Sequence, residues 1–211
     1  MIYYIWWFCM AENYDKWLDK KIHQLIEKGE VPTILLHSCC APCSSYVIEY
    51  LSNYFYITIL YYNPNISPIQ EYEKRKAEQV RLIHTMKTKY PVKIMDCDYD
   101  NDLYEKSIQG LELEPEKGKR CTVCFKLRMS KTASLAQKNH FDYFGTTLTV
   151  SPYKNAMLIN SIGSELEERY HVSFLFSDFK KRNGYKRSIE LSSLYGLYRQ
   201  NYCGCKYSKR D

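Results

Sequence analysis

The sequence predicts an α/β protein with an open, mostly parallel β-sheet and helices on both faces. Short apolar runs rich in strand-forming residues alternate with longer segments whose apolar residues recur at helical spacing. Strands and helices that alternate along a chain favour a parallel sheet with right-handed crossovers. The 211 residues are 45% hydrophobic and 26% charged. This globular composition excludes a collagen-like, low-complexity or wholly disordered chain.

The first predicted unit is a strand, a helix and a second strand. Residues 31–38 (VPTILLHS) and 55–62 (FYITILYY) are apolar runs of strand length. Between them, residues 44–54 place Tyr46, Val47, Tyr50 and Leu51 at helical spacing. We therefore expect the two strands to be parallel neighbours.

A long helix is predicted to follow, from Ser67 to about residue 89. Ser67, Pro68 and Gln70 match a capping box with proline at the first helical position. We expect its inner face to be apolar and its outer face charged, the inner residues being Ile69, Tyr72, Val80, Ile83 and Met86. Further elements are expected as a strand at 92–95, a helix at 121–138, a strand at 141–146, a helix at 152–169 and a strand at 172–176.

The chain is expected to form a single catalytic domain in three parts. Residues 1–30 are an N-terminal extension, residues 31–179 the α/β core, and residues 180–211 a basic C-terminal segment. That segment holds nine Lys and Arg against two acidic residues, with tyrosines between them. Such a pattern is typical of surfaces that contact RNA phosphates and stack on unpaired bases, and equally of a solvated basic terminus. The candidate phosphate contacts are Arg182, Lys186, Arg187 and Arg199.

The apolar start of the chain, residues 1–10, is about half the roughly 20 residues of a membrane-spanning helix. It also lacks the basic first segment and cleavage site of a secretory signal. We therefore expect a cytoplasmic protein with no membrane association. In that reducing compartment, the nine cysteines are better explained by metal binding or redox chemistry than by structural disulfides.

The densest group of cysteines is Cys39, Cys40 and Cys43, between the first predicted strand and the following helix. A helix N-terminus stabilises thiolates, so these sulfurs are candidate metal ligands or nucleophiles. Small buried thiols that merely pack under the sheet are the structural alternative.

Two further pairs follow, Cys121 with Cys124 and Cys203 with Cys205. The first is a CxxC spacing used by zinc sites, iron–sulfur clusters and redox pairs. The second flanks a glycine, which suits a strained disulfide or two metal ligands. Together with the first group they make seven sulfurs, more than the four that one zinc ion or one cubane cluster takes, so we expect additional redox or metal chemistry. Cys9 and Cys97 stand apart.

Five motifs together resemble the QueH-type epoxyqueuosine reductases. They are HSCCAPCS, YYNPNISPIQEYEKR, RCTVCFKLRM, GTTLTVSPYKN and YRQNYCGC, in this order over residues 34–205. The resemblance implies a fold similar to the adenine-nucleotide α-hydrolase layer. It also implies a cobalamin-independent reduction of epoxyqueuosine to queuosine at the tRNA wobble position, the final step of queuosine biosynthesis, with electrons from an unidentified donor.

The same resemblance implies a 4Fe-4S cluster with ligands drawn from Cys39, Cys40, Cys121 and Cys124. Cys203 and Cys205 would be the catalytic, redox-active pair, or one of them would ligate the cluster. A second metal ion, iron or zinc, would take Cys43 and Cys205 with one of the two adjacent cysteines. Whether the second reducing equivalent comes from the dithiol, or the second ion acts as a Lewis acid, stays open.

The proton donor and the reaction class each leave alternatives. Tyr202, Tyr153 and Lys154 are candidate donors, whereas His37 is expected to orient the cysteine loop. The competing functions are a tRNA-thiolating enzyme and a zinc- or iron–sulfur-dependent tRNA-binding protein. The loop after the first strand holds cysteines in place of a glycine-rich phosphate loop, which disfavours nucleotide cleavage.

Overall fold

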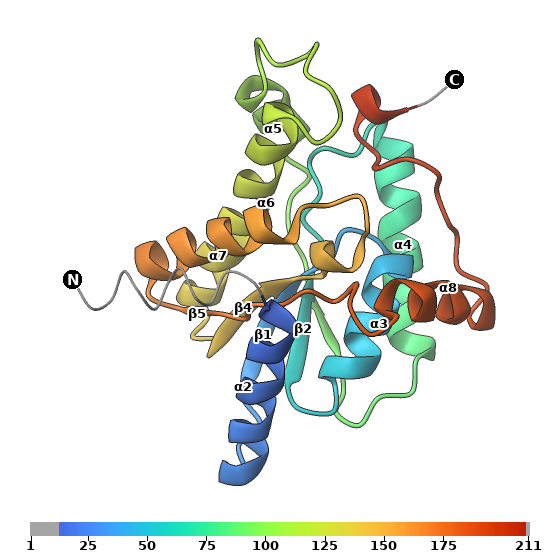
Figure 1. Ribbon diagram of the computed structural model, residues 1–211. Coiled ribbons are helices and arrows are strands. Elements are labelled where there is room, and N and C mark those ends of the chain that lie inside the picture. The colour runs from blue at the N-terminus through green and yellow to red at the C-terminus, as the bar shows by residue number, and fades with distance from the viewer. Residues whose placement is uncertain (1–12, 210–211) are drawn as a thin grey trace.

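The computed structural model describes residues 13–209, which form an α/β fold around a five-stranded parallel sheet (Figure 1). The strand order is β3-β2-β1-β4-β5, and all neighbours are parallel. The strands are β1 (Thr33–His37), β2 (Tyr56–Leu60), β3 (Lys93–Met95), β4 (Tyr143–Thr146) and β5 (Ser173–Phe174). The predicted fold class and strand positions are confirmed. Because the chain builds outward from β1 in both directions, the end of β1 is a topological switch point, where α/β sheets bind ligands.

Helices lie on both faces of the sheet. They are α2 (Tyr14–Lys28), α3 (Ala41–Leu51), α4 (Ile69–Thr85), α5 (Asn101–Ser107), α6 (Lys119–Lys138), α7 (Ala156–Tyr170) and α8 (Gly184–Leu194), with 3₁₀ turns η1 (Thr147–Val150) and η2 (Lys206–Ser208). The sequence predicted α3, α4, α6 and α7 and missed α2, α5 and α8. Within residues 13–209, none of the helices combines the length and hydrophobicity needed to cross a lipid bilayer.

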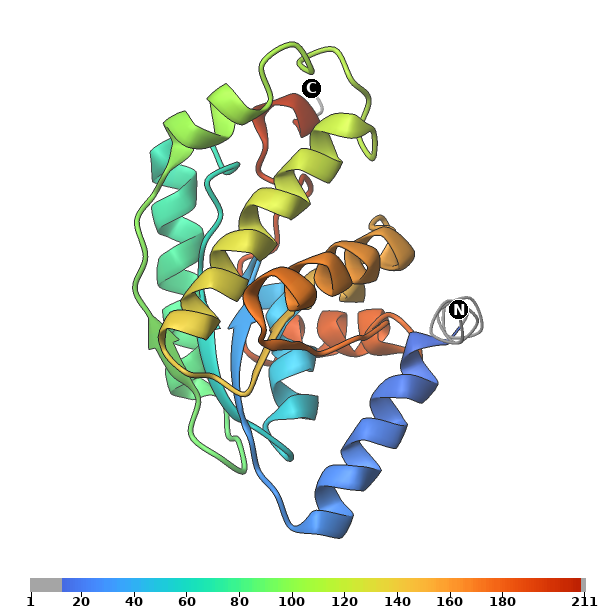
Figure 2. The same ribbon diagram turned by 90° about the vertical axis from the view of Figure 1, so that its left-hand side faces the viewer.

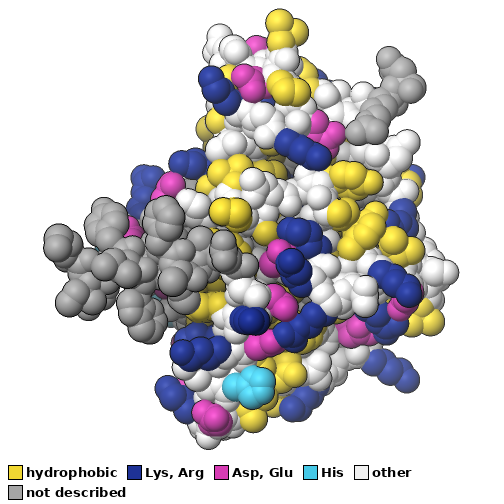
Figure 3. All heavy atoms as spheres, viewed as in Figure 1, with side chains coloured by type: hydrophobic (Ala, Val, Ile, Leu, Met, Phe, Trp, Pro, Cys, Tyr) yellow, Lys and Arg dark blue, Asp and Glu magenta, His cyan; other side chains and the backbone are white. Residues whose placement is uncertain are grey.

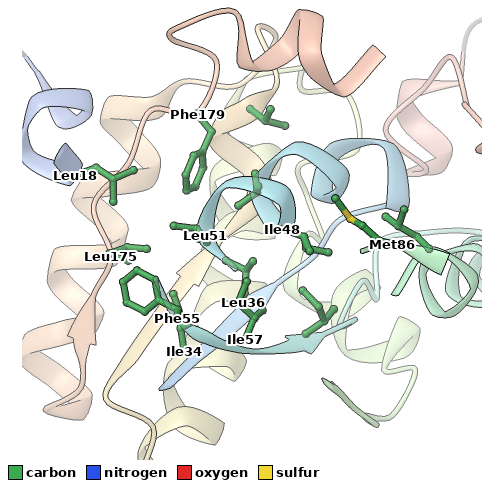
Figure 4. Close-up of a cluster of buried hydrophobic side chains, with 14 of the residues drawn as sticks. Leu18, Ile34, Leu36, Ile48, Leu51, Phe55, Ile57, Met86, Leu175 and Phe179 are labelled. Carbon is green, nitrogen blue, oxygen red and sulfur yellow. The ribbon is translucent and has the colours of Figure 1, made fainter. Parts of the chain in front are cut away.

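One face of the sheet packs against α2, α3 and α4 (Figure 4). Ile34 and Leu36 of β1 and Ile57 of β2 point into this layer, where they meet Ile48 and Leu51 of α3. All five side chains are fully buried or nearly so. Each such burial stabilises the fold by about 1.5–3 kcal/mol. The core thereby holds the end of β1 and the start of α3 in place, on either side of the residues that carry Cys39 and Cys40.

The opposite face packs against α6 and α7. Leu35 of β1, between the two residues that face the other layer, meets Phe144 of β4 and Met129 of α6 here. A parallel strand buried on both sides reads as a continuous apolar run, which is why residues 31–38 were recognisable. This second layer fixes the first turns of α6, with Cys121 and Cys124, relative to the end of β1.

The buried face of α4 differs in part from the predicted one. Tyr72 and Met86 are buried as predicted, but Ile69 is half exposed, and the other buried residues of the helix are Arg75, Gln79 and Leu82. Pro68, rather than Ser67, holds the N-cap position, and no side chain caps this helix. The helix is rotated because its polar residues have hydrogen-bond partners at the edge of the sheet, which the apolar spacing could not reveal.

The last part of the C-terminal segment, residues 195–209, runs along α4 toward the region of α5 and the start of α6 (Figures 1 and 2). Glu78 accepts a hydrogen bond from the Tyr198 amide at 2.6 Å, and Arg81 donates to the carbonyls of Tyr195 and Gly196 at 3.0 and 3.2 Å. These contacts hold residues 195–198 against α4, and the chain continues from there to Cys203 and Cys205.

Candidate metal and redox centre at the carboxyl edge of the sheet

Three cysteines lie together where β1 ends and α3 begins, in residues 38–43, which we call the cysteine loop. The Sγ atoms of Cys39, Cys40 and Cys43 all lie within 4.8 Å of one another, and those of Cys39 and Cys40 are 3.9 Å apart. Cys40 is the N-cap residue of α3 with extended backbone, and Pro42 lies in the first turn. This geometry turns the side chains of Cys39 and Cys40 toward Cys43. Two consecutive residues within a strand would point to opposite faces of the sheet.

Hydrogen bonds from two other elements hold the cysteine loop. Gln79 of α4 is fully buried, and its Oε1 accepts from Ser38 Oγ at 2.7 Å and from Ser44 Oγ at 2.8 Å. The side chain of Asn63, after β2, donates to the Ser38 carbonyl at 2.7 Å. Gln79 thus ties together the two residues that flank the three thiols.

The three thiols share one favourable site for negative charge. Hydrogen bonds from Cys40 and Cys43 hold the pKa of Cys39 well below its usual range. The same bonds raise the pKa of the donors, for Cys40 to about 12 and for Cys43 further. One thiolate held by two thiols is a ready ligand set for a thiophilic metal ion, which would replace the remaining thiol protons.

His37 joins the ends of three strands and carries no charge near neutral pH. Its Nδ1 lies 2.9 Å from Thr146 Oγ1 and its Nε2 lies 3.2 Å from the Tyr62 carbonyl. The carbonyl accepts only from an N–H, so Nε2 is the protonated nitrogen. Burial, with the charge of Arg128, lowers the pKa of His37 to about 3. These bonds fix the ring between β1, β2 and β4 at the start of the cysteine loop.

The second group of sulfurs consists of Cys121 and Cys124, in the first turns of α6, and the C-terminal pair. Cys124 and Cys205 are buried in one apolar cluster, in which Tyr104 of α5 also packs. The Tyr104 hydroxyl lies 3.2 Å from Cys205 Sγ. Burial raises the pKa of Cys121 and raises that of Cys124 to about 12, and the charges of Cys203 and Cys205 add to both shifts. The structure therefore places Cys124 and Cys205 in one buried cluster with Tyr104.

The C-terminal pair is reduced, as are all the cysteines between residues 13 and 209. The Ser67 amide donates to the Gly204 carbonyl at 3.0 Å. Gly204 has a φ of +100°, a backbone conformation that favours glycine. Cys97 lies elsewhere, with its Sγ donating to the Tyr61 carbonyl at 3.2 Å, and Cys9 lies outside the described residues.

Two cations lie between the groups of sulfurs. Arg128 is 1% exposed, and its Nε donates to the Cys124 carbonyl at 3.2 Å. Burial of Lys154 opposes its charge, but negative charge on Cys203, Cys39 and Cys43 outweighs this and raises its pKa. Thiolates on both sides therefore interact with the same cations. Sequence reasoning named Lys154 and missed Arg128, although Arg128 follows Cys121 and Cys124 by seven and four positions on one helix face.

Comparisons with known proteins show the family to which the chain belongs. A sequence model of the family described as "Epoxyqueuosine reductase QueH" matches residues 34–211. The chain belongs to this family. A protein of Staphylococcus epidermidis named epoxyqueuosine reductase QueH is 46% identical over 200 residues, covering 93% of this chain and 84% of the relative. Relatives of the same name from Streptococcus pyogenes serotype M1 and Thermotoga maritima are 44% and 35% identical, covering 94% and 83% of this chain and 78% and 90% of their own.

Family membership indicates the kind of chemistry that the clustered thiols would serve. QueH proteins are reductases by name, and the cysteine loop offers three thiols at metal-ligand spacing. The site is therefore one for metal or iron–sulfur chemistry.

The other two candidate proton donors are Tyr153 and Tyr202. Tyr153 is 62% exposed, with the Lys117 amine 5.8 Å from its ring centroid. Tyr202 is partly buried, and the guanidinium of Arg75 lies 5.0 Å from its ring centroid. Of the donors predicted from sequence, Lys154 is the one whose charge interacts with both groups of sulfurs.

The four basic residues predicted to contact tRNA lie on or beside α8, on a face where basic and acidic side chains alternate (Figure 3). Arg182 pairs with Asp15 and Asp19 of α2. Arg187 forms a bidentate pair with Glu49 of α3, at 2.7 and 2.9 Å. Arg199 donates to the Ser192 hydroxyl at 3.1 Å, and Lys186 is exposed. Arg182 and Arg187 therefore also link α8 to the core.

Proposed function

We propose that this protein reduces epoxyqueuosine to queuosine at the wobble position of tRNA, the final step of queuosine biosynthesis. The observation that supports the proposal is the group of three thiols within 4.8 Å of one another at the end of β1, the topological switch point of the sheet, in a chain of the QueH family. Because the proposed substrate is tRNA, we also propose that the protein works in the cytoplasm.

The sulfur spacing supports a metal-loaded site. The sulfurs of Cys39, Cys40 and Cys43 all lie within 4.8 Å of one another, close enough to serve as ligands of neighbouring metal centres. We assign a 4Fe-4S cluster to ligands drawn from Cys39, Cys40, Cys121 and Cys124. The adjacent cysteine that the cluster does not take would, with Cys43, be a ligand of a second ion, iron or zinc, and Cys205 would join them only if it were not part of the redox pair. When bound, the cluster supplies one-electron transfer and the ion supplies Lewis acidity.

The C-terminal dithiol completes the electron balance. Removing the epoxide oxygen as water breaks two C–O bonds and takes up two electrons and two protons. Oxidation of Cys203 and Cys205 to a disulfide releases two electrons and two protons, so one turnover balances. An external reductant then returns the pair to the dithiol, the state present in this structure.

The chain's cations stabilise the charges of this reaction. Arg128 and Lys154 compensate thiolates on Cys39 and Cys203, and they would equally stabilise negative charge on the leaving oxygen. Lys154 holds a proton on Nζ beside these sulfurs, which makes it our first candidate for protonating that oxygen. Lys186 and Arg199, which are exposed in the C-terminal segment, are our first candidates for phosphate contacts. Arg182 and Arg187 are the second.

The test is anaerobic incubation of the reconstituted protein with tRNA that carries epoxyqueuosine, a chemical reductant and nucleoside mass spectrometry. We expect the modified nucleoside to lose one oxygen atom. Binding of the tRNA without any change in nucleoside mass would favour the competing function of a tRNA-binding protein. Colour gives a first indication, because an iron–sulfur protein is brown and a zinc protein is colourless.

A further inference from the structure

Arg75 is a buried arginine that the chemistry above does not use. It ends the motif Tyr61–Arg75 on α4 and is 2% exposed. Its Nε donates to Glu71 Oε1 at 2.6 Å, and its Nη1 donates to the Cys203 carbonyl at 3.2 Å. A buried charge is costly unless it is fully hydrogen-bonded. Besides Glu71, the hydrogen-bond partner of this buried guanidinium is the backbone carbonyl of Cys203, a candidate redox cysteine.

The approach of Arg75 to the C-terminal pair leaves no spare room. A Cβ at Gly204 would lie 2.8 Å from Arg75 Nη1 and 2.9 Å from the Ile66 side chain. The partner of Arg75, Glu71, also accepts a hydrogen bond from the Tyr198 hydroxyl at 3.2 Å. The Glu71–Arg75 pair thus holds the segment at both Tyr198 and Cys203.

Cys205 is held separately, from the other side. The Tyr104 hydroxyl of α5 lies 3.2 Å from its Sγ, whereas the hydrogen bond from Arg75 goes to the Cys203 carbonyl. The two thiols are therefore positioned by different helices, Cys203 by α4 and Cys205 by α5.

Arg75 also lies on the buried face of α4, and its Nη2, buried, has no hydrogen-bond partner among the described residues. One turn further along the same helix face, Gln79 ties Ser38 to Ser44 across that loop. The same face of α4 therefore supports both the C-terminal pair and the cysteine loop.

We propose that Arg75 is a positioning residue that fixes Cys203 relative to the cysteine loop, so that the dithiol is oriented for electron transfer. Its importance for turnover rests on the proposed function, but its effect on Cys203 does not. The C-terminal segment has further anchors at Glu78 and Arg81, so loss of Arg75 frees Cys203 without detaching the segment.

The test is timed alkylation of the full-length protein, purified and reduced without oxygen, with peptide mass spectrometry to follow Cys203 and Cys205 separately. In Arg75→Met, Cys203 should react about tenfold faster, because a buried hydrogen bond to a charged donor no longer restrains it. Cys205 should keep its rate. Arg75→Lys, which retains the charge but not the fork of donors, should lie between wild type and Arg75→Met.

The matched control is Arg81→Met, on the same helix. Arg81 donates to the Tyr195 and Gly196 carbonyls of the same segment but contacts neither cysteine, so both rates should stay as in wild type. If the unpaired Glu71 prevents Arg75→Met from folding, the double variant Glu71→Gln/Arg75→Met removes that charge and gives the same readout.

Two results would overturn the proposal: an unchanged Cys203 rate in Arg75→Met or in the double variant, or an equal increase at Cys203 and Cys205. Turnover is a separate readout. We expect kcat for epoxyqueuosine reduction to fall about tenfold with KM for tRNA unchanged. Faster alkylation of Cys203 with normal kcat would support the positioning of Cys203 and contradict its role as a reductant.

Discussion

Replacing Gln79 by Met tests whether α4 organises the cysteine loop. The substitution keeps an unbranched side chain of similar length but removes the oxygen that accepts hydrogen bonds from Ser38 and Ser44 at 2.7 and 2.8 Å. Ser44 keeps a second acceptor, the Ala41 carbonyl at 3.1 Å. The buried Ser38 hydroxyl is therefore the group that loses its acceptor.

The structure sets the size of the effect. A buried hydroxyl without a partner costs about 1–3 kcal/mol. In a domain of this size each kcal/mol lowers the melting temperature by about 2–4 °C, so we expect a decrease of about 2–12 °C. Metal affinity should fall by about 10–100-fold, as for other residues that orient metal ligands. The reason is that Gln79 joins the two residues that flank the three thiols.

The assay is a titration of metal-stripped, reduced protein with Co²⁺, followed by thiolate-to-cobalt absorption and by thermal unfolding. Ser45→Ala is the matched control. It removes one hydrogen bond, from Ser45 Oγ to the Pro42 carbonyl at 2.9 Å, in the same turn, but does not touch the link through Gln79. We expect it to lose some stability and no Co²⁺ affinity. A Gln79→Met protein that binds Co²⁺ as tightly as wild type would refute the reasoning.

Three further predictions concern the other elements of the site. Cys121→Ala should lose brown colour and turnover together, whereas Cys203→Ser should stop turnover and keep most of the colour; a pale Cys203→Ser protein would instead make that sulfur a cluster ligand. Gly204→Ala should destabilise the protein by about 1–3 kcal/mol in urea unfolding, because its φ is +100° and its Cβ has no room; unchanged stability would contradict the close packing. A hydrogen bond from Arg81 lowers the pKa of Glu78, so its stabilisation is present above the unfolded pKa and is lost as pH falls through the folded value. Glu78→Gln should therefore flatten the fall in melting temperature below about pH 5, and an equally steep fall would be evidence against it.

The sequence predicted the elements that surround the cysteine loop because each is apolar over its whole length or carries a motif. It missed α5, which has seven residues in a polar stretch. So short a helix is not stable alone; it forms because Tyr104 and Ile108 pack against Cys124 and Cys205. The sequence also gave no sign of α8 as a helix, since its charges suggested a solvated tail. Its buried side includes two serines, Ser188 and Ser192.

The cysteines of the candidate site could be named from the sequence and the residues that support them could not, for one physical reason. Cysteines at CxxC spacing indicate a site by residue type alone. Arg75 and Gln79 are polar residues of an amphipathic helix, and the predicted inner face of that helix was apolar. Their burial depends on partners far along the chain, the Cys203 carbonyl for Arg75 and the Ser38 and Ser44 hydroxyls for Gln79. Hydrophobic periodicity carries no information on such partners.

The rotation of α4 thus follows from the site itself. A helix that covered this edge with Ile69, Val80 and Ile83 would leave the hydroxyls of the cysteine loop and the carbonyls of the C-terminal segment without partners, at about 1–3 kcal/mol for each buried group. Burying Arg75 and Gln79 satisfies both sets and leaves Ile69 half exposed, at a cost below about 1.5–3 kcal/mol for a side chain that is only partly uncovered. The hydrogen bonds outweigh the lost apolar burial, and the same choice gives one helix contacts with both thiol-bearing segments.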